Sequence, residues 1–141
     1  MTERSAALEQ LCQKYHIDIL YIFGSRAAEI REWAEMKRPE LPPGPSDVDV
    51  GVKPAPGVDF FLDEKVRFAL ALEDLLGVTR VDLVSLPEAD PFLAANIIRG
   101  ERLYARDEYL ADEYDLYILR RAGDLAPFER ERMALVLRQK P

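Results

Sequence analysis

The chain has 141 residues, of which 48% are apolar, and this is enough to bury the core of one domain. Its net charge of −7 repels phosphate backbones, which excludes broad attachment to DNA or RNA. No apolar run approaches the roughly 18 residues that cross a bilayer, and the first residues lack the pattern of a signal peptide. We therefore expect a single cytoplasmic domain over residues 1–141, without a membrane partner.

One cysteine and one histidine limit the chemistry further. Cys12 cannot form an internal disulfide, and we expect it to act as a small apolar residue in a helix. His16 alone cannot build a histidine-centred zinc site, and we expect it at a helix end. The chain also lacks the Arg-x-x-x-x-His motif of HEPN-type nucleases.

The first third of the chain predicts a helix, a strand and a second helix. Residues 2–15 have helical apolar spacing, and Thr2 can cap them. Residues 17–23 are β-branched or aromatic, which is typical of a buried strand. Residues 25–37 are predicted to be helical. The four prolines of residues 38–46 then forbid regular structure.

The middle of the chain predicts two strands with a helix between them. Strict alternation indicates a strand over residues 47–53, and residues 80–86 form another apolar strand. The helix covers residues 59–76, and Gly77 suits the position just after its end. We expect its inner stripe to consist of Leu62, Val66, Ala69, Leu72 and Leu76.

The last third is mainly helical. Residues 87–99 are partly helical, residues 102–105 form a short strand, and residues 107–139 form a helical tail. We expect Pro127 to divide this tail into two helices, because proline has no amide hydrogen. Strands and helices interleave along the chain. The predicted fold class is therefore α+β, a small mixed β-sheet flanked by helices with a C-terminal helical tail.

Two aspartates share one face of the strand over residues 47–53. The period of two sends Asp47 and Asp49 to one side and the intervening valines to the other. Aspartate is depleted in strands, so a pair at this spacing calls for a reason. One explanation is a functional site. The other is an edge strand with one solvated face, which is common in antiparallel sheets.

A third aspartate lies early in the next predicted strand. Asp82 can be an ordinary strand-end residue, or it can join Asp47 and Asp49 if the two strands are neighbours. Carboxylates about 4 Å apart repel each other by around 4 kcal/mol at an effective dielectric near 20, so a cation is needed to keep three of them together. Hard divalent cations prefer oxygen ligands. Such a triad predicts an Mg²⁺ or Mn²⁺ site for phosphoryl or nucleotidyl transfer.

A glycine-serine turn is predicted where the first strand meets the second helix. Gly24 allows a ligand to approach the backbone, Ser25 offers a hydroxyl, and the helix start offers free N–H groups to phosphate. By itself this pattern is also typical of an ordinary helix cap. The order along the chain makes it informative: a Gly-Ser turn, an Asp-x-Asp strand and then a further Asp on a strand.

This ordered set resembles the minimal nucleotidyltransferases of the DNA polymerase β superfamily, the antitoxin-type partners of HEPN toxins. The resemblance rests on Gly24-Ser25, on Ser46-Asp47-Val48-Asp49-Val50 and on Val81-Asp82-Leu83-Val84. It covers about residues 6–105, where the stretch from Ile98 to Tyr104 is similar to the family's closing strand.

The resemblance implies a role for each matching residue. Asp47 and Asp49 would ligate a pair of Mg²⁺ or Mn²⁺ ions, and Asp82 would complete this catalytic metal site and help to activate the incoming hydroxyl. Nucleotide binding is expected at the turn formed by Gly24, Ser25 and Arg26, with ATP as the substrate. Members of this family transfer AMP to a tyrosine of the HEPN partner and thereby neutralise it.

The chain departs from the family pattern after the turn. Ala28-Glu29 stands where the family usually has Arg-Gly, and 21 residues separate Ser25 from Asp47. The added segment, residues 28–45, could cover the nucleotide, offer a surface to a partner or block the usual substrate. Glu29 adds a negative charge near the expected triphosphate.

The tail leaves several functions open. Its apolar stripe of Leu110, Tyr114, Tyr117, Ile118 and Leu125 can pack on the chain's own sheet or bind a partner. Arg120, Arg121, Arg130 and Arg132 can form a solvated face or contact a nucleotide or an acidic partner. A homo-oligomer is possible. The expected function is transfer of a nucleoside monophosphate to a partner protein's hydroxyl. The alternatives are a binding-only antitoxin and a small-molecule adenylyltransferase.

Overall fold

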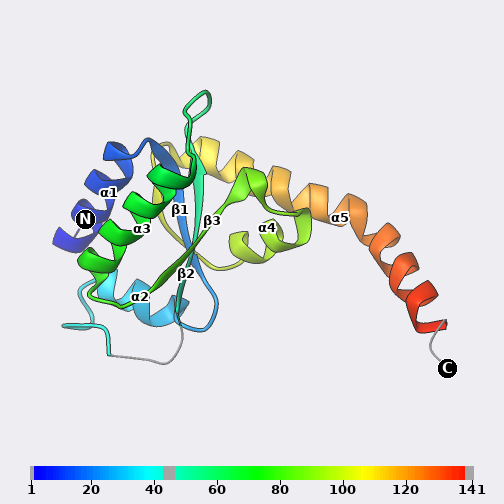
Figure 1. Ribbon diagram of the computed structural model, residues 1–141, viewed down its shortest axis with the longest axis horizontal. Coiled ribbons are helices and arrows are strands. Elements are labelled where there is room, and N and C mark those ends of the chain that lie inside the picture. The colour runs from blue at the N-terminus through cyan, green and yellow to red at the C-terminus, as the bar shows by residue number, and fades with distance from the viewer. Residues whose placement is uncertain (1, 43–46, 139–141) are drawn as a thin grey trace.

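A four-stranded mixed sheet forms the centre of the molecule (Figure 1). The computed structural model describes residues 2–42 and 47–138. The strands are β1 (Ile17–Phe23), β2 (Val48–Pro54), β3 (Val81–Ser85) and β4 (Glu101–Ala105), in the order β3-β2-β1-β4. β1 runs antiparallel to β2 and β4, whereas β2 and β3 are parallel. The predicted mixed sheet is confirmed.

Helices cover both faces of this sheet. One face packs against α1 (Glu3–Lys14), α2 (Ala27–Ala34) and α3 (Leu62–Leu76). The other packs against α4 (Pro91–Ile98) and the first part of α5 (Glu108–Arg138), and a short 3₁₀ turn, η1 (Leu86–Glu88), follows β3. None of the helices described is long and apolar enough to cross a membrane.

Local signals at the helix ends agree with the sequence. The Thr2 hydroxyl accepts a hydrogen bond from the Ser5 amide at 3.0 Å and so caps α1. Gly77 ends α3 with the left-handed φ of 70° that glycine adopts without strain. Cys12 is fully buried in α1, and His16 follows the helix end with a positive φ of 56°.

The inner face of α3 differs from the prediction. Leu62 and Val66 are exposed by 73% and 48%, whereas Phe68, Leu72 and Leu76 are buried. The reason lies just before the helix. Phe60 packs edge-on against Phe68, with 6.3 Å between ring centroids, and fills the space beside the sheet that the first turn was expected to occupy.

The predicted break at Pro127 is wrong, because α5 runs through it without interruption. Pro127 cannot donate to the carbonyl of Gly123, four residues earlier. Both residues are exposed, so water can satisfy that carbonyl. The predicted stripe is also only partly right: Ile118 is buried, but Leu110 and Tyr117 are more than half exposed. Small alanines, Ala111 and Ala122, complete the buried face instead.

Candidate nucleotidyl-transfer site

The three predicted carboxylates come from neighbouring strand ends. In the parallel ladder Asp49 lies directly opposite Asp82, and in the antiparallel ladder it lies opposite Phe23, the last residue of β1. The starts of β2 and β3 and the end of β1 therefore lie together at the same end of the sheet. The condition set by the sequence, that the two Asp-bearing strands be neighbours, is fulfilled.

Strand alternation orients the carboxylates as expected. Val48 and Val50 are fully buried under the helices of one face, so Asp47 and Asp49 point to the opposite face. Asp82 lies on the same side because it is paired with Asp49 in a parallel ladder. Burial raises the pKa of Asp49 above the usual aspartate range, and the charges of Asp82 and Asp47 raise it further. The three side chains thus act on one another electrostatically.

These carboxylates border a common space but do not converge on one point. The Asp47 Oδ2 faces the guanidinium of Arg80, 3.4 Å from its Nε. Within residues 2–42 and 47–138, no group of three acidic, histidine or cysteine side chains forms a closed metal cluster. The Asp47 contact with Arg80 is exposed and weak. The donor set, aspartate oxygens alone, fits a hard divalent cation.

Gly24 brings the backbone against this carboxylate group. Its φ is +79°, and a Cβ built on it would collide with the Oδ2 of Asp49. Only glycine adopts this left-handed backbone without strain and also leaves room for the Asp49 carboxylate. The predicted turn therefore lies beside the aspartates, with Gly24 and Ser25 exposed.

Ser25 does not serve as an ordinary helix cap. α2 begins at Ala27, its N-cap residue is Arg26, and no side chain caps it with a hydrogen bond. The Ala27 amide donates to the Gly24 carbonyl at 3.3 Å, and no side chain caps the amides that follow it, next to a turn that borders Asp49. Helix starts with free amides favour phosphate. Ser46, which belonged to the sequence motif, lies outside the described residues.

Comparison with known proteins decides the family. The family described as "Polymerase beta, Nucleotidyltransferase" matches residues 6–109, close to the expected 6–105. The chain belongs to this nucleotidyltransferase family. A solved structure described as a minimal nucleotidyltransferase is 31% identical, with 70% of this chain and 86% of that chain covered and a TM-score of 0.52. No curated protein gave a match.

Two further solved structures share the fold of this nucleotidyltransferase over nearly its whole length. One is the MntA–HepT toxin–antitoxin, at 17% identity, with 95% of this chain and 97% of that chain covered and a TM-score of 0.66. The other is a tri-AMPylated Shewanella oneidensis HEPN toxin in complex with an MNT antitoxin, also at 17% identity, with 95% and 96% covered and a TM-score of 0.66.

Arg26 of the nucleotidyltransferase turns toward the added segment. Its side chain is buried, contacts the carboxylate of Glu29 and donates to the Pro42 carbonyl at 2.8 Å. The negative charge of Glu29 is thereby balanced within the protein. Three residues were expected at the nucleotide. Gly24 and Ser25 lie beside the carboxylates, whereas Arg26 contacts Glu29 and Pro42.

The added segment is tied to the body at several points. From α1, Arg4 donates to the Trp33 carbonyl at 3.0 Å and to the carbonyls of Arg38 and Pro39, and it stacks on the Trp33 ring at 4.8 Å. Leu41 is buried in the core. The helix of this segment is shorter than predicted, ending at Ala34 rather than residue 37. Residues 43–45 lie outside the described part.

Sequence reasoning missed a second polar cluster on the α4–α5 face. The guanidinium of Arg102 on β4 donates to Asp115 at 3.0 Å and to Glu108 and Asp112 at 2.8 Å each, and the hydroxyl of buried Tyr21 donates to Asp115. These bonds fasten the start of α5 to the sheet. The spacing of acids along the tail was visible in the sequence, but their shared arginine lies on a different element.

Proposed function

We propose that the chain transfers AMP from ATP to a hydroxyl group on a partner protein, and that the partner is a HEPN-type toxin. Family membership supports nucleotidyl transfer, and the arrangement of Gly24 beside Asp49 supports a site for it. In this reaction the acceptor oxygen bonds to the α-phosphorus of ATP, the bond to the β-phosphate breaks, and pyrophosphate leaves while the acceptor gives up a proton. The observation that carries the proposal is that Asp49 lies opposite Asp82 in the sheet and against Gly24 of the glycine-serine turn.

Each residue has a role in this proposal. Asp47, Asp49 and Asp82 hold divalent cations, Mg²⁺ or Mn²⁺, which supply charge stabilisation for the phosphorus centre and its leaving group. Asp82, the exposed member of the set, also accepts the proton of the incoming hydroxyl. The amides at the start of α2 and the Ser25 hydroxyl bind the triphosphate, and the lack of a side chain on Gly24 lets Asp49 lie against this turn.

A protein acceptor is favoured over a small molecule. The described residues form one sheet with its covering helices, and Ser25 and Asp82 are exposed at the end of that sheet. Solved structures of similar fold include a tri-AMPylated HEPN toxin with its MNT antitoxin. We propose the same pairing for this chain, in the cytoplasm, where ATP and Mg²⁺ are abundant.

Transfer of label tests the proposal. The chain is incubated with Mg²⁺, ATP labelled at the α-phosphate and a HEPN-type protein encoded by a neighbouring gene. We expect label on that protein, and we expect Asp47→Asn combined with Asp49→Asn to abolish it. Asp74→Asn, on the exposed side of α3, is the matched control and should label normally.

Three results would contradict the proposal in different ways. Label on a metabolite with no protein present would identify a small-molecule adenylyltransferase. Toxin inhibition that survives the double substitution, without any label, would identify a binding-only antitoxin. Equal labelling by the double variant would remove the aspartates from the reaction.

A further inference from the structure

The end of the sheet opposite the carboxylates, which we call the far end, brings three strands together. Ile17 of β1 is paired with Pro54 of β2, and Ile19 with Ala105 of β4, so the start of β1 lies beside the ends of β2 and β4. Along β1, steps of about 3.3 Å per residue place the far end about 20 Å from Phe23 and the carboxylates. In Figure 1 the loop after β2 marks the far end at the top, and α2 marks the carboxylate end at the bottom.

Two hollows adjoin at the far end. The first, of about 460 Å³, lies between the start of α5, the start of β1 and the end of β2. The second, of about 410 Å³, lies between the loop after β2 and the segment that follows β3. Both are lined by Lys53 and Pro56, so they form one groove, which we call the far-end groove. Hollows of this size are typical of sites that bind a ligand or a partner's side chain.

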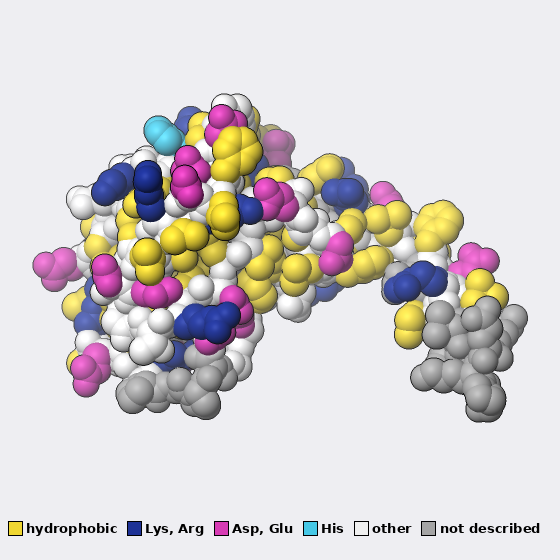
Figure 2. Space-filling view, viewed as in Figure 1, with side chains coloured by type: hydrophobic (Ala, Val, Ile, Leu, Met, Phe, Trp, Pro, Cys, Tyr) yellow, Lys and Arg dark blue, Asp and Glu magenta, His cyan; other side chains and the backbone are white. Residues whose placement is uncertain are grey.

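The far-end groove has an apolar floor, and large hydrophobic side chains are exposed around it. Ile19 and Ala111 are buried at the floor of the first hollow. Leu110 and Phe61, one in the lining of each hollow, are exposed by 58% and 64%. In Figure 2 hydrophobic side chains lie among acidic ones at the top of the body, where Figure 1 shows the loop after β2. Exposed apolar side chains gathered around a hollow indicate an interaction site.

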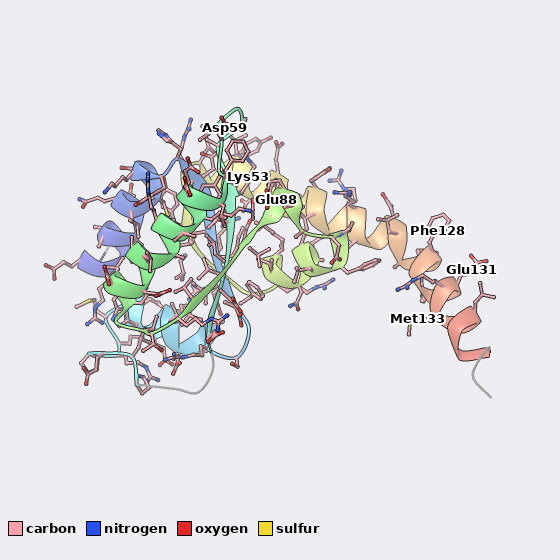
Figure 3. All side chains as sticks on the ribbon, viewed as in Figure 1. Lys53, Asp59, Glu88, Phe128, Glu131 and Met133 are labelled. Carbon is pink, nitrogen blue, oxygen red and sulfur yellow. The ribbon has the colours of Figure 1, made fainter. Side chains whose placement is uncertain are left out.

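Carboxylates outnumber cations around the far-end groove. The five carboxylates and two cations in its lining belong to Asp18, Asp59, Glu88, Asp107, Glu113, Lys53 and Arg106. Both cations face Asp18, at 3.7 Å from Lys53 and 3.6 Å from Arg106. Lys65, outside the lining, pairs with Glu88, so five carboxylates still stand against three cations. In Figure 3 the labelled Lys53, Asp59 and Glu88 lie close together at the far end.

The apolar floor and the excess of carboxylates together indicate what binds. An apolar side chain on the floor removes apolar surface from water, which drives binding. Lysines or arginines beside it complement the carboxylates, most of which are exposed, so this attraction adds specificity and weakens with salt. Because the two hollows adjoin, a chain segment can place side chains in both, whereas a small molecule fills only one. A protein segment with apolar and basic residues therefore fits best.

We propose that the far-end groove docks a segment of a partner protein in which lysines or arginines flank an apolar anchor side chain. The anchor packs on Ile19 and Ala111, and the basic residues face Glu113 in the first hollow and Asp59 in the second. The proposal goes beyond the transfer reaction and does not depend on it. Because the groove lies about 20 Å along β1 from the carboxylates, the bound segment leaves the transfer site open.

Peptide binding to the full chain tests the groove. The first probe is a synthetic peptide with leucine and phenylalanine between pairs of lysines. One further peptide has glutamates in place of the lysines, and another has serines in place of the apolar residues. We expect the first peptide to bind, with an affinity that falls as salt is raised, and the glutamate peptide not to bind. The serine peptide should bind about tenfold more weakly or worse, because it lacks the anchor.

Two matched pairs of variants locate the binding. Leu110→Ser is compared with Leu116→Ser, because both leucines lie on α5 and are exposed by 58% and 55%, but only Leu110 lines the groove. We expect Leu110→Ser to weaken binding of the first peptide about tenfold and Leu116→Ser to leave it unchanged. Asp59→Lys should weaken binding severalfold and reduce its salt dependence, whereas Asp74→Lys, on the exposed side of α3, should not. Circular dichroism shows whether each variant is folded.

Several results would overturn the proposal. Equal binding of the glutamate peptide would remove the charge complementarity, and equal binding of the serine peptide would remove the apolar anchor. Equal affinities of the Leu110→Ser and Leu116→Ser variants would place the peptide outside the groove. A dimer of the chain that Leu110→Ser dissolves would make a second copy the occupant.

Binding in the absence of nucleotide separates this inference from the proposed function. The variant with Asp47→Asn and Asp49→Asn should bind the first peptide with normal affinity although it transfers no label. The bound peptide should leave the affinity for ATP with Mg²⁺ unchanged, and competition with ATP would place the peptide at the carboxylates and overturn docking at the far end. Normal peptide binding by an unmodified protein that transfers no label would refute the transfer reaction and leave the docking surface intact.

Discussion

Two groups of carboxylates lie on the same face of the sheet, and the protein balances their charges in opposite ways. At β4, the guanidinium of Arg102 binds three carboxylates of α5. At the strand ends, the pKa of Asp49 is raised by burial and by the charges of Asp82 and Asp47. The first group is held by a cation of the chain, whereas in the second the contact of Asp47 with exposed Arg80 leaves the pKa of Asp49 raised.

The Arg102 group therefore holds α5 to the sheet, whereas the strand-end group is a candidate binding site. Carboxylates that share an arginine stabilise the fold, because their charges are compensated as soon as the chain folds. Carboxylates that face one another weaken the fold, so they are retained only where something else gains from them. Substitutions should therefore have opposite effects on stability in the two groups, and activity should depend on one of them alone.

The largest effect is expected for transfer activity at the strand ends. Asp82→Asn should lower the rate of label transfer roughly a thousandfold, which is about 4 kcal/mol of transition-state stabilisation. Single-turnover measurement with saturating ATP would separate this loss from weaker binding. A variant within threefold of the unmodified protein would show that Asp82 takes no part in the reaction.

The Arg102 group should show the largest effect on stability. Arg102→Ala leaves the partly buried carboxylate of Asp115 without its cation and should lower the free energy of unfolding by about 3 kcal/mol, because the exposed pairs with Glu108 and Asp112 add little to the charged bonds with Asp115. Urea unfolding followed by circular dichroism measures this. Arg99→Ala, at the exposed end of α4, is the control. A loss no larger than that of the control would mean that the bonds to α5 contribute nothing.

A divalent cation should stabilise only the second group. Mg²⁺ at about a hundred times its Kd should raise the free energy of unfolding by about 2.7 kcal/mol. Thermal unfolding with Mg²⁺ and with a chelator would show the gain in the unmodified protein and in Arg102→Ala. The variant with Asp47→Asn and Asp49→Asn should lose it. The same gain in that variant would place the cation elsewhere.

A smaller effect is expected where the added segment meets the turn. Arg26→Ala removes the bonds to Glu29 and to the Pro42 carbonyl and should cost about 1.5 kcal/mol, the scale of a charged hydrogen bond. Arg31→Ala is the matched control, since its pairs are more exposed and worth less. Equal losses in the two variants would show that burial of Arg26 adds nothing.

The smallest effect has the opposite sign. Without divalent cations, Asp49→Asn should raise the free energy of unfolding at pH 7 by up to about 1 kcal/mol, because it removes one of three repelling charges. A raised pKa means that the folded state holds the proton more tightly than the unfolded one. Stability is therefore lost as the pH rises from the ordinary aspartate pKa near 3.9 to the raised value. The two proteins should converge below that window, and a variant destabilised at pH 7 would contradict this.

Much of the site region could be predicted because strand periodicity is a local property. The alternation of Asp47, Val48 and Asp49 predicted that the two aspartates lie on the face opposite Val48. In the structure Val48 is buried under the helices of one face, and Asp49 lies on the other face opposite Asp82. The sequence could not show that Phe60 would occupy the place intended for Leu62, because that depends on a contact between a loop and a helix. Long-range contacts of this kind leave no periodic signal.

The added segment shows the same limit. Prolines predicted that residues after α2 would be irregular, but nothing local indicated that Arg4, on another helix, would bind their carbonyls. Arg26 was assigned to the nucleotide from its position in the motif, and its contacts with Glu29 and Pro42 depend on where the segment returns to the body. The Pro127 prediction failed because an exposed helix can tolerate a carbonyl without an amide partner.

Gly51 has a consequence for access to the aspartates. It follows Asp49 by two residues on the same face of β2, and a Cβ there would collide with Ile97 of α4. Because Gly51 has no side chain, α4 packs closely on the sheet at this position, two residues along β2 from Asp49. α4 thus covers β2 as far as Gly51, and Asp82 on the neighbouring strand is exposed. In the proposed reaction, the acceptor hydroxyl of the partner protein would reach Asp82 from solvent.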